Sequence, residues 1–401
     1  MEDRSDGVNN LWPLLLKYPV FEERLEGLIQ EGLFRSINDR DSPQGRVIKT
    51  GGRYLINFSS NDYLGLCNHP AIREAVVRAV AEYGAGSGAS RLISGGTGLH
   101  RRLESLAARL KGTEASVIFG SGYTANTGVI PAISGSNTTI FSDELNHASL
   151  IDGCRLSKAG VFIYRHKDME HLDGLLHRHR REKSVIITDS VFSMDGDIAP
   201  VGELRELALR YDAMLYIDDA HGTGVLGGGG GALSHFGLSP DPFIIQMGTF
   251  SKAAGSYGAF VAATGVVTKW LINTSRTFMY STALPAHLIA ASIEAVNIIL
   301  NDSSLVERLW KNRNYLVDGL HSIGMDTGLS QTPIVPVVLK DNRSAVGLSE
   351  FLMSGGIYAP AIRQPTVKTP RVRFTVSAVH TEEDIDLLVK RLKEARDCGL
   401  F

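Results

Sequence analysis

Short apolar runs alternate with longer segments of mixed polarity through the middle of the sequence, and this alternation limits the folds open to the chain. The apolar runs have the length of strands, and segments such as 150–158, 169–181 and 201–211 have the length of covering helices. Strands that alternate with helices predict a largely parallel sheet buried on both faces. The candidate strands are 116–119, 138–141, 160–164, 184–188, 213–217, 243–248 and 259–264.

These elements predict one large α/β domain over residues 46–295, followed by a smaller α+β domain over residues 296–401. Residues 1–45 predict one amphipathic helix, over 21–31, and a polar connection. The glycine run 227–231 predicts a mobile surface loop. In the smaller domain the expected elements are strands at 332–340, 357–361 and 371–377, a helix at 344–353, and a last helix that begins at the capping-box-like Thr381-Glu382-Glu383-Asp384.

The composition excludes several classes of protein. The 401-residue chain has a formal net charge of −2, so no whole-molecule field would gather nucleic acid or an anionic membrane. Its first residues lack the basic start and apolar core of a signal peptide, and no apolar stretch reaches the roughly 18 residues of a membrane helix. The three cysteines lie far apart, which supports neither a disulfide framework nor a metal site. We expect a cytoplasmic protein.

A single lysine follows a buried strand among small residues. The apolar run 243–248 leads into Thr249, Ser251 and Lys252. Burial lowers the pKa of a lysine and makes its amine nucleophilic toward an aldehyde, and the two hydroxyls could bind a phosphate. An ordinary solvated loop lysine would look the same, so this segment alone decides nothing.

A second strand delivers a carboxylate at its end. Asp218 closes the run 213–217, and His221 follows three residues later. In open α/β sheets, ligands bind at the carboxyl ends of strands. A carboxylate there can keep a pyridine nitrogen protonated, which makes pyridoxal phosphate (PLP) an electron sink. The alternative is a helix cap with a structural histidine.

Two further groups follow strands. The spacing Gly120-x-Gly122-x-x-Ala125 turns a strand into a helix whose free N–H groups can bind an anion. It also fits a dinucleotide fingerprint, with Asp143 beyond the next strand, so a nicotinamide-dependent reductase is the rival interpretation. No Tyr-x-x-x-Lys pair of short-chain reductases occurs in the sequence. His147, also just past a strand, could stack on a flat cofactor, and a PLP site uses all of these groups.

With these residues in place, the sequence resembles the α-oxoamine synthases, PLP enzymes of the aspartate aminotransferase fold (fold type I). The likeness covers about residues 33–393 and implies a large mixed-sheet domain with a smaller α+β C-terminal domain. It rests on Asn57-Phe58-Ser59-Ser60-Asn61-Asp62-Tyr63-Leu64-Gly65-Leu66, the glycine-rich segment 84–98, Val191-Phe192-Ser193-Met194-Asp195-Gly196-Asp197, Asp218-Asp219-Ala220-His221-Gly222-Thr223-Gly224 and Tyr280-Ser281-Thr282-Ala283-Leu284-Pro285.

The resemblance implies a role for each matching residue. Lys252 would carry PLP as a Schiff base and later move the substrate proton, while Asp218 would pair with the pyridine nitrogen. Around the ring, His147 would stack, and His221 and Ser193 would reach the phenolic oxygen. The implied phosphate ligands are Gly122, Tyr123, Thr249 and Ser251, with Ser281 and Thr282 reaching the phosphate of the neighbouring subunit of a homodimer.

The resemblance also implies the substrate contacts. Arg363 matches the arginine assigned to the amino-acid carboxylate, with Arg371 and Arg373 as the next candidates. Thr366 and Arg35 would lie beside the acyl donor. The stretch 366–371 is about two residues shorter than the family pattern, and Gln364 replaces the usual proline, which bears on the identity of the acyl chain.

Within the family, the motifs favour the branch that condenses L-alanine with a pimeloyl thioester, carried by CoA or a carrier protein, in biotin synthesis. The alternative branch joins glycine to acetyl-CoA, and residues 145–153 resemble both. A catalytically silent partner subunit would typically lack the lysine that stands here at position 252.

Overall fold

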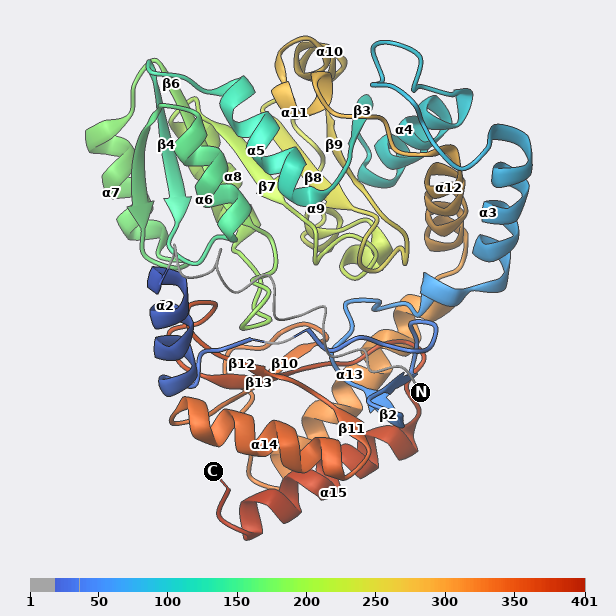
Figure 1. Cartoon of the computed structure of the whole chain (residues 1–401). Coiled ribbons are helices and arrows are strands. Elements are labelled where there is room, and N and C mark those ends of the chain that lie inside the picture. Colours follow the sequence, from blue (N-terminus) through green and yellow to red (C-terminus); the bar gives the residue numbers. More distant parts are fainter. Residues whose placement is uncertain (1–18, 36, 401) are drawn as a thin grey trace.

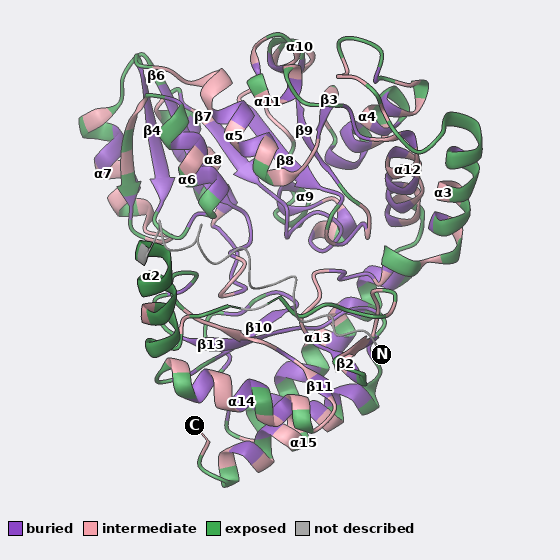
Figure 2. Cartoon of the chain, in the orientation of Figure 1, coloured by how far each residue is buried: buried purple, intermediate pink, exposed green. Residues whose placement is uncertain are grey.

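The structure, a computed structural model, describes residues 19–35 and 37–400. Figure 1 shows a larger domain built around one sheet, a smaller domain below it, and the N-terminal helix α2 (Pro19–Gln30) beside the junction of the two. Helix α2 is exposed along nearly its whole length (Figure 2). It confirms the predicted N-terminal helix to within two residues.

The large domain holds a seven-stranded mixed sheet in the order β3-β9-β8-β7-β6-β4-β5. Strands β4 to β8 run parallel, while β9 is antiparallel to both of its neighbours. Most of these strands are buried on both faces, which is why they read as unbroken apolar runs. The strands are β3 (Ala115–Phe119), β4 (Thr138–Asp143), β5 (Gly160–Tyr164), β6 (Lys183–Asp189), β7 (Met214–Asp218), β8 (Ile244–Thr249) and β9 (Ala259–Ala263).

Helices cover both faces of this sheet, and alternate strand residues face opposite layers. Helices α5 (Gly122–Ile133), α6 (Ala148–Leu156) and α10 (Gly265–Thr274) pack with one set of strand residues. The other set packs with a second group of helices, in a core that continues into the smaller domain. These are α4 (Gly98–Lys111), α7 (Met169–His179), α8 (Val201–Arg210) and α12 (Ala286–Asn301), with α3 (Pro70–Tyr83) packed on α12 and the short α9 (Ala232–His235) and α11 (Arg276–Met279) between elements.

The smaller domain has two three-stranded sheets, ordered β10-β13-β12 and β1-β2-β11. Strands β1 and β2 form a hairpin, and β11 pairs in parallel with β2. This pairing corrects the predicted domain boundary at residue 46, because residues 47–57 complete a sheet of the smaller domain. The elements are β1 (Val47–Thr50), β2 (Arg53–Asn57), α13 (Ser304–Ser322), β10 (Ile334–Val338), α14 (Asn342–Ser354), β11 (Ile357–Tyr358), β12 (Ala361–Ile362), β13 (Arg371–Thr375) and α15 (Glu382–Asp397).

The glycine run departs from the sequence-based prediction. It was expected to be a mobile surface loop, yet Gly229 and Gly231 are buried. The run closes over an ion pair between Lys111 and Asp219, and the carbonyl of Gly230 accepts a hydrogen bond from the same ammonium at 3.0 Å. A Cβ on Gly231 would collide with both charged groups, and its φ of +99° also favours glycine.

Among the described residues, no single helix is long and apolar enough to cross a membrane; α12 and α13 pass that test only as a pair, bent by 76° between them. Most residues of α12 are buried in the core or packed against it.

Candidate active site

Polar side chains gather where the parallel strands of the large sheet end. Asp143, Asp189, Asp218 and Thr249 are the last residues of β4, β6, β7 and β8. Because these four strands run in the same direction, their carboxyl ends lie on one edge of the sheet, next to the smaller domain (Figure 1). Lys252 follows Thr249 by three residues and therefore reaches the same edge.

The surroundings of Lys252 lower the pKa of its amine, which favours nucleophilic chemistry. Burial lowers its pKa below the usual value, and the negative charges of Asp218 and Asp189 oppose that shift. The nearby cation Arg373 lowers the pKa further. A lysine with a lowered pKa spends more time as the free amine, the form that attacks a carbonyl carbon.

Asp218 is buried beside this lysine. Burial raises its pKa, and the charge of Lys252 is the largest opposing influence. One carboxylate oxygen accepts a hydrogen bond from Asn126 Nδ2 at 2.7 Å, and the other accepts from the main-chain N–H of Ala220 at 2.9 Å. These bonds hold the carboxylate in one orientation and favour its charged form.

His147 begins helix α6 as its N-cap residue. Its main-chain N–H donates to Asp189 Oδ2 at 2.7 Å, and its ring Nδ1 lies 2.7 Å from the hydroxyl of Ser149. Burial lowers the pKa of His147, so the ring is neutral near pH 7. Asp189, whose pKa burial raises well above its usual value, was not predicted as a site residue although it ends a strand as Asp218 does.

His221 sits on the turn after β7 and is also buried. Its Nδ1 lies 2.7 Å from the hydroxyl of Tyr63, a residue of the motif at 57–66 that sequence reasoning gave no role. Burial and the charges of Lys252 and Arg373 hold the pKa of His221 well below its usual value. The imidazole therefore acts as a neutral hydrogen-bonding group.

The predicted anion site forms at the start of helix α5. The side chain of Ser121 caps this helix by accepting a hydrogen bond from the main-chain N–H of Thr124. The first two helical N–H groups, at Gly122 and Tyr123, have no acceptor inside the helix. Helix N-termini of this kind attract phosphate groups. Figure 1 places the start of α5 at the same end of the sheet as the end of β8.

Thr249 and Ser251 stand at the end of β8. The hydroxyls of both donate to the carbonyl of Gly258, at 2.9 and 3.3 Å. The main-chain N–H of Ser251 donates to the Thr249 hydroxyl at 3.1 Å. Both side chains are thus fixed at the strand end, and Ser251 remains exposed to solvent.

Comparison with known proteins identifies the family. Residues 53–392 match the family described as aminotransferase class I and II. The chain belongs to this family. It is 45% identical over 378 residues to the 8-amino-7-oxononanoate synthase of Thermoanaerobacter pseudethanolicus, covering 93% of this chain and 95% of that one. It is 45% identical over 387 residues to the enzyme of the same name from Symbiobacterium thermophilum, covering 94% and 98%.

Solved structures agree with the fold. A serine palmitoyltransferase variant from S. paucimobilis with bound PLP–myriocin superposes with a TM-score of 0.90 at 27% identity, covering 97% of this chain and all of that one. The 8-amino-7-oxononanoate synthase of Francisella tularensis superposes with a TM-score of 0.75 at 26% identity, covering 86% and 99%. These matches confirm the predicted fold class, a large mixed-sheet domain followed by a smaller C-terminal one.

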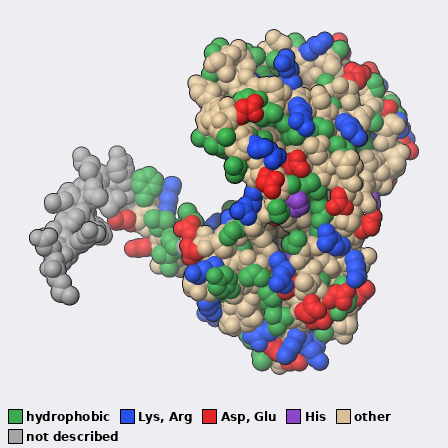
Figure 3. Space-filling model, turned by 90° about the vertical axis from the view of Figure 1, so that its right-hand side faces the viewer, with side chains coloured by type: hydrophobic (Ala, Val, Ile, Leu, Met, Phe, Trp, Pro, Cys, Tyr) green, Lys and Arg blue, Asp and Glu red, His purple; other side chains and the backbone are tan. Residues whose placement is uncertain are grey.

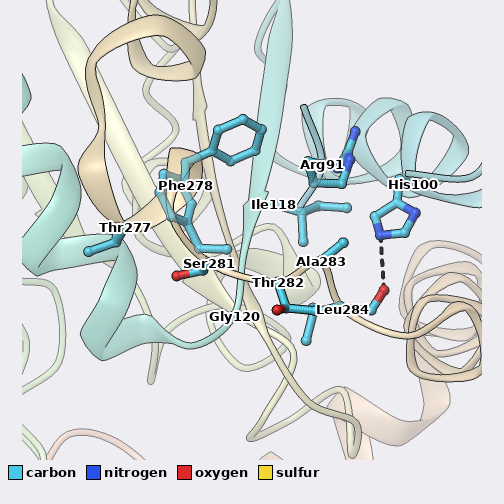
Figure 4. A pocket seen from close by; sticks show the side chains of 11 residues that line it. Arg91, His100, Ile118, Gly120, Thr277, Phe278, Ser281, Thr282, Ala283 and Leu284 are labelled. Carbon is cyan, nitrogen blue, oxygen red and sulfur yellow. Dashed lines mark hydrogen bonds between the residues drawn. The ribbon is translucent and has the colours of Figure 1, made fainter. Parts of the chain in front are cut away.

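Two hydroxyl residues matched to the family's cross-subunit contact lie in the pocket shown in Figure 4. Ser281 and Thr282 line it together with Gly120, from the turn before α5, and with Arg91. Both hydroxyl residues are exposed, and Thr282 pairs through its main chain with Ser90. The pocket is closed on the other side by His100, whose Nε2 lies 3.1 Å from the carbonyl of Leu284.

Arg363 does not point toward the groups around Lys252. Its guanidinium donates to the main-chain carbonyl of Gly32, and also to that of Phe34 at 3.5 Å. Arg35 donates in return to the carbonyl of Gln364 at 2.9 Å. The two arginines therefore join the segment after α2 to the loop that precedes β13.

That loop forms one wall of a cavity of about 420 Å³. Thr366, exposed, lies at this wall, and Ser193 and Met194 lie on another. The cavity has a mixed lining, with apolar side chains of Leu145, Ile151, Phe192, Met194, Pro365 and Val367 beside the charged Glu144, Asp195, Lys368 and Arg371. Figure 3 shows the surface hollowed at the junction of the two domains, with charges of both signs along it.

Arg373, on β13, is the cation that the structure brings to Lys252. It is buried, and its guanidinium donates to the carbonyl of Ser193 at 2.5 Å, to the hydroxyl of Thr375 at 3.0 Å and to Asn61 Oδ1 at 3.1 Å. All three acceptors are neutral. Within residues 19–35 and 37–400, no carboxylate lies within ion-pair distance of Arg373. Arg371, by contrast, is paired with Asp195 at 2.5 Å.

Proposed function

We propose that this chain is a PLP-dependent enzyme that condenses L-alanine with a pimeloyl thioester, releases CO2 and forms 8-amino-7-oxononanoate, an intermediate of biotin synthesis. The observation that carries the proposal is that Lys252 and the buried carboxylate of Asp218 share one sheet edge, where the charge of each shifts the pKa of the other. The substrates follow from the named relatives, which are 42–51% identical to the chain over more than nine-tenths of its length.

The residues at this edge fit PLP in each of its functional groups. Lys252 would supply the amine for the aldehyde carbon, and Asp218 would supply a carboxylate for the pyridine nitrogen. The free N–H groups of Gly122 and Tyr123, with Thr249 and Ser251, would hold the phosphate. His147 would stack on the ring, and His221 and Ser193 would lie toward its phenolic oxygen.

When bound, PLP withdraws electrons from the bonds at the Cα atom of the amino acid. The chain's own residues would do the rest. Lys252 would take and return the Cα proton, because it follows β8 onto the edge of the sheet where Asp218 lies, and burial lowers the pKa of its amine. Neutral His221 would keep a hydrogen bond with Tyr63 and add no positive charge.

The amino-acid carboxylate needs a cation, and Arg373 suits that role better than Arg363. Arg373 is buried, lacks a counter-charge among the described residues and acts on the pKa of Lys252. An uncompensated buried charge is costly, so a bound carboxylate would stabilise it. Arg363, Arg35 and Thr366 would instead lie along the path of the acyl donor.

The cavity of about 420 Å³ would take the acyl chain. This volume falls within the range of small-molecule sites, and six apolar side chains line it. An acetyl group would leave most of it empty, which favours a longer acyl chain. Two subunits would complete each site, with Ser281 and Thr282 reaching the phosphate of the partner.

The test pairs amino acids with acyl donors. Purified protein loaded with PLP would be incubated with alanine, glycine or serine against pimeloyl-CoA, a pimeloyl carrier protein, acetyl-CoA and palmitoyl-CoA, with CO2 and product measured by mass spectrometry. We expect turnover with alanine and a pimeloyl thioester. Preference for glycine with acetyl-CoA, or for serine with palmitoyl-CoA, would contradict the proposed substrates.

A second measurement addresses the cofactor itself. Borohydride should fix PLP to the chain, and peptide mapping should find the label on Lys252. A label on another lysine would overturn the assignment, whichever substrates are used. The Lys252→Ala protein should still bind PLP without a covalent bond, because the phosphate and Asp218 contacts remain.

A further inference from the structure

A chain of buried hydrogen bonds runs beneath the site and involves three residues without an assigned role. Asn126, on α5, is fully buried. Its Nδ2 donates to Asp218 Oδ2 at 2.7 Å and to the hydroxyl of Ser149 at 2.8 Å. Its Oδ1 accepts from the hydroxyl of Tyr216 at 2.8 Å. One amide thus connects Asp218 with Ser149, which in turn contacts His147.

The chemistry of an amide makes this chain directional. An asparagine Nδ2 carries two hydrogens and accepts none, so Asp218 and Ser149 must both act as acceptors toward it. The reversed amide would set its oxygen against the carboxylate of Asp218, which is repulsive. Tyr216 donates to the oxygen and holds the amide in the favourable orientation.

The same logic fixes a proton on His147. Because the Ser149 hydroxyl accepts from Asn126, its own hydrogen is free to point to His147 Nδ1, 2.7 Å away. The main-chain N–H of Ser149 also donates to this nitrogen, at 3.3 Å. Nδ1 is therefore an acceptor, and the neutral ring carries its hydrogen on Nε2.

We propose that Asn126 is a positioning residue that sets the protonation of two residues of the site, keeping Asp218 a charged acceptor and His147 in its Nε2–H form. The part of this inference that concerns Asp218 rests on the proposed function, because it assumes that Asp218 faces a pyridine nitrogen. The part that concerns His147 holds for the protein without PLP.

The electrostatics of the site give Asn126 a reason to be there. Asp218 is buried, which raises its pKa, and the hydrogen bond from Asn126 is one of the influences that lower it. Asp189, also buried, adds a second carboxyl group nearby, while the charge of Lys252 acts in the opposite sense. Without the amide, Asp218 would take up a proton more readily, and a neutral acid holds a pyridinium hydrogen less well.

The first experiment compares Asn126→Leu, which keeps the volume but removes the hydrogen bonds, with Asn312→Leu. Asn312 is a buried asparagine on α13 that likewise donates two hydrogen bonds, to the carbonyls of Ser377 and His380. Each variant would be measured for thermal unfolding without PLP, for PLP affinity and for the pH midpoint of the visible absorbance of the PLP-loaded protein.

We expect Asn126→Leu to weaken PLP binding by about tenfold or more, the scale of one charge-assisted hydrogen bond, and to shift the pH midpoint. Asn312→Leu should lower the melting temperature and leave both PLP readouts unchanged. If Asn126→Leu lowers the melting temperature but leaves affinity and pH midpoint at wild-type values, the residue is only structural and the proposal fails. Should Asn126→Leu not fold, Tyr216→Phe, which frees the amide to turn, replaces it in the same assays.

The second experiment separates the His147 branch. In apo protein labelled with 15N-histidine, the ring nitrogens of His147, assigned by loss of its signals in His147→Gln, should show hydrogen on Nε2. Ser149→Ala should move these signals and change PLP affinity by less than about threefold. Ser157→Ala, at the other end of α6, is the control, because its hydroxyl donates to the carbonyl of Cys154. Hydrogen on Nδ1 in the wild type would overturn the inference, whereas wild-type protein that binds no PLP would overturn only the proposed function.

Discussion

Replacing Arg373 by alanine should remove the anchor of the amino-acid carboxylate while leaving the cofactor groups in place. The guanidinium has only neutral acceptors, the carbonyl of Ser193, the hydroxyl of Thr375 and the amide oxygen of Asn61. Among the residues that the structure describes, Arg373 is therefore the one buried cation at this edge without a negatively charged partner. The family resemblance had implied Arg363 instead.

The size of the effect follows from this geometry. Truncating one partner of a buried, hydrogen-bonded charge pair costs about 2–5 kcal/mol. We therefore expect kcat/KM for L-alanine to fall by about a hundredfold to a thousandfold, or about 3–4 kcal/mol of transition-state stabilisation. Part should come from KM and part from kcat, because a carboxylate that rotates freely also misaligns the Cα–H bond with Lys252.

The assay is steady-state turnover with alanine varied at saturating acyl donor, for Arg373→Ala, Arg373→Lys and Arg363→Ala. Lysine keeps the positive charge but cannot form the bidentate hydrogen bonds of a guanidinium, so Arg373→Lys should recover only part of the lost kcat/KM. Arg363→Ala should change the alanine KM by less than about threefold and affect the acyl donor more. If instead Arg363→Ala raises the alanine KM and Arg373→Ala does not, the argument from buried, unpaired charge is refuted. Thermal unfolding of each apo variant controls for lost stability.

Three other predictions follow from the structure. Mixing Lys252→Ala protein with a Ser281→Ala/Thr282→Ala double variant should restore activity after subunit exchange, because hybrids hold one intact site. His166→Gln should reduce the unfolding free energy measured in urea most below pH 6.5 and little above pH 9. Burial disfavours the His166 cation, but hydrogen bonds to Asp143 and Asp197 outweigh burial and raise the pKa of His166 to about 9. The stabilisation by His166, at most about 3 kcal/mol, is therefore present below the pKa of the unfolded state and lost as pH rises through that of the folded state. Gly231→Ala should lower the unfolding free energy by more than about 2 kcal/mol, since its Cβ meets a buried ion pair.

Each of these three predictions has an outcome that would contradict it. A protein that is fully active as a monomer would contradict the shared site. A stability difference for His166→Gln that grows with pH would contradict the assigned proton. Gly228→Ala shares the positive φ but has open space around it, so it should cost only about 1 kcal/mol; equal losses at the two glycines would mean that the ion pair plays no part.

Most of the large domain could be predicted from the sequence because its strands are buried on both faces. Each of the seven predicted strands lies within two residues of an observed one, and the capping box at Thr381 is present as predicted. The pairing of β2 with β11 could not be predicted, because about 300 residues separate the two strands and neither carries a local signal of its partner. That pairing is what moved the domain boundary.

The site divides in the same way. Lys252 and Asp218 were predictable because each follows an apolar run, and Asp189 obeys the same rule and could have been found by it. Arg373 alternates with apolar residues on a strand, a signal that a charge is buried for a reason. Asn126 had no such signal, because its contact with Asp218 depends on how helix α5 is rotated against the sheet.

The two consecutive aspartates at the end of β7, Asp218 and Asp219, have different surroundings. Asp219 is enclosed by Lys111, the hydroxyl of Ser190 at 2.6 Å and the main-chain N–H of Ala232. A bound ligand is therefore exposed to the charge of Asp218 but not to that of Asp219, because Asp219 is buried with its counter-ion Lys111. Gly231 lets the main chain close over that ion pair, because a Cβ at this position would collide with both charged groups. The glycine at position 231 therefore serves the electrostatic shielding of Asp219 rather than loop flexibility.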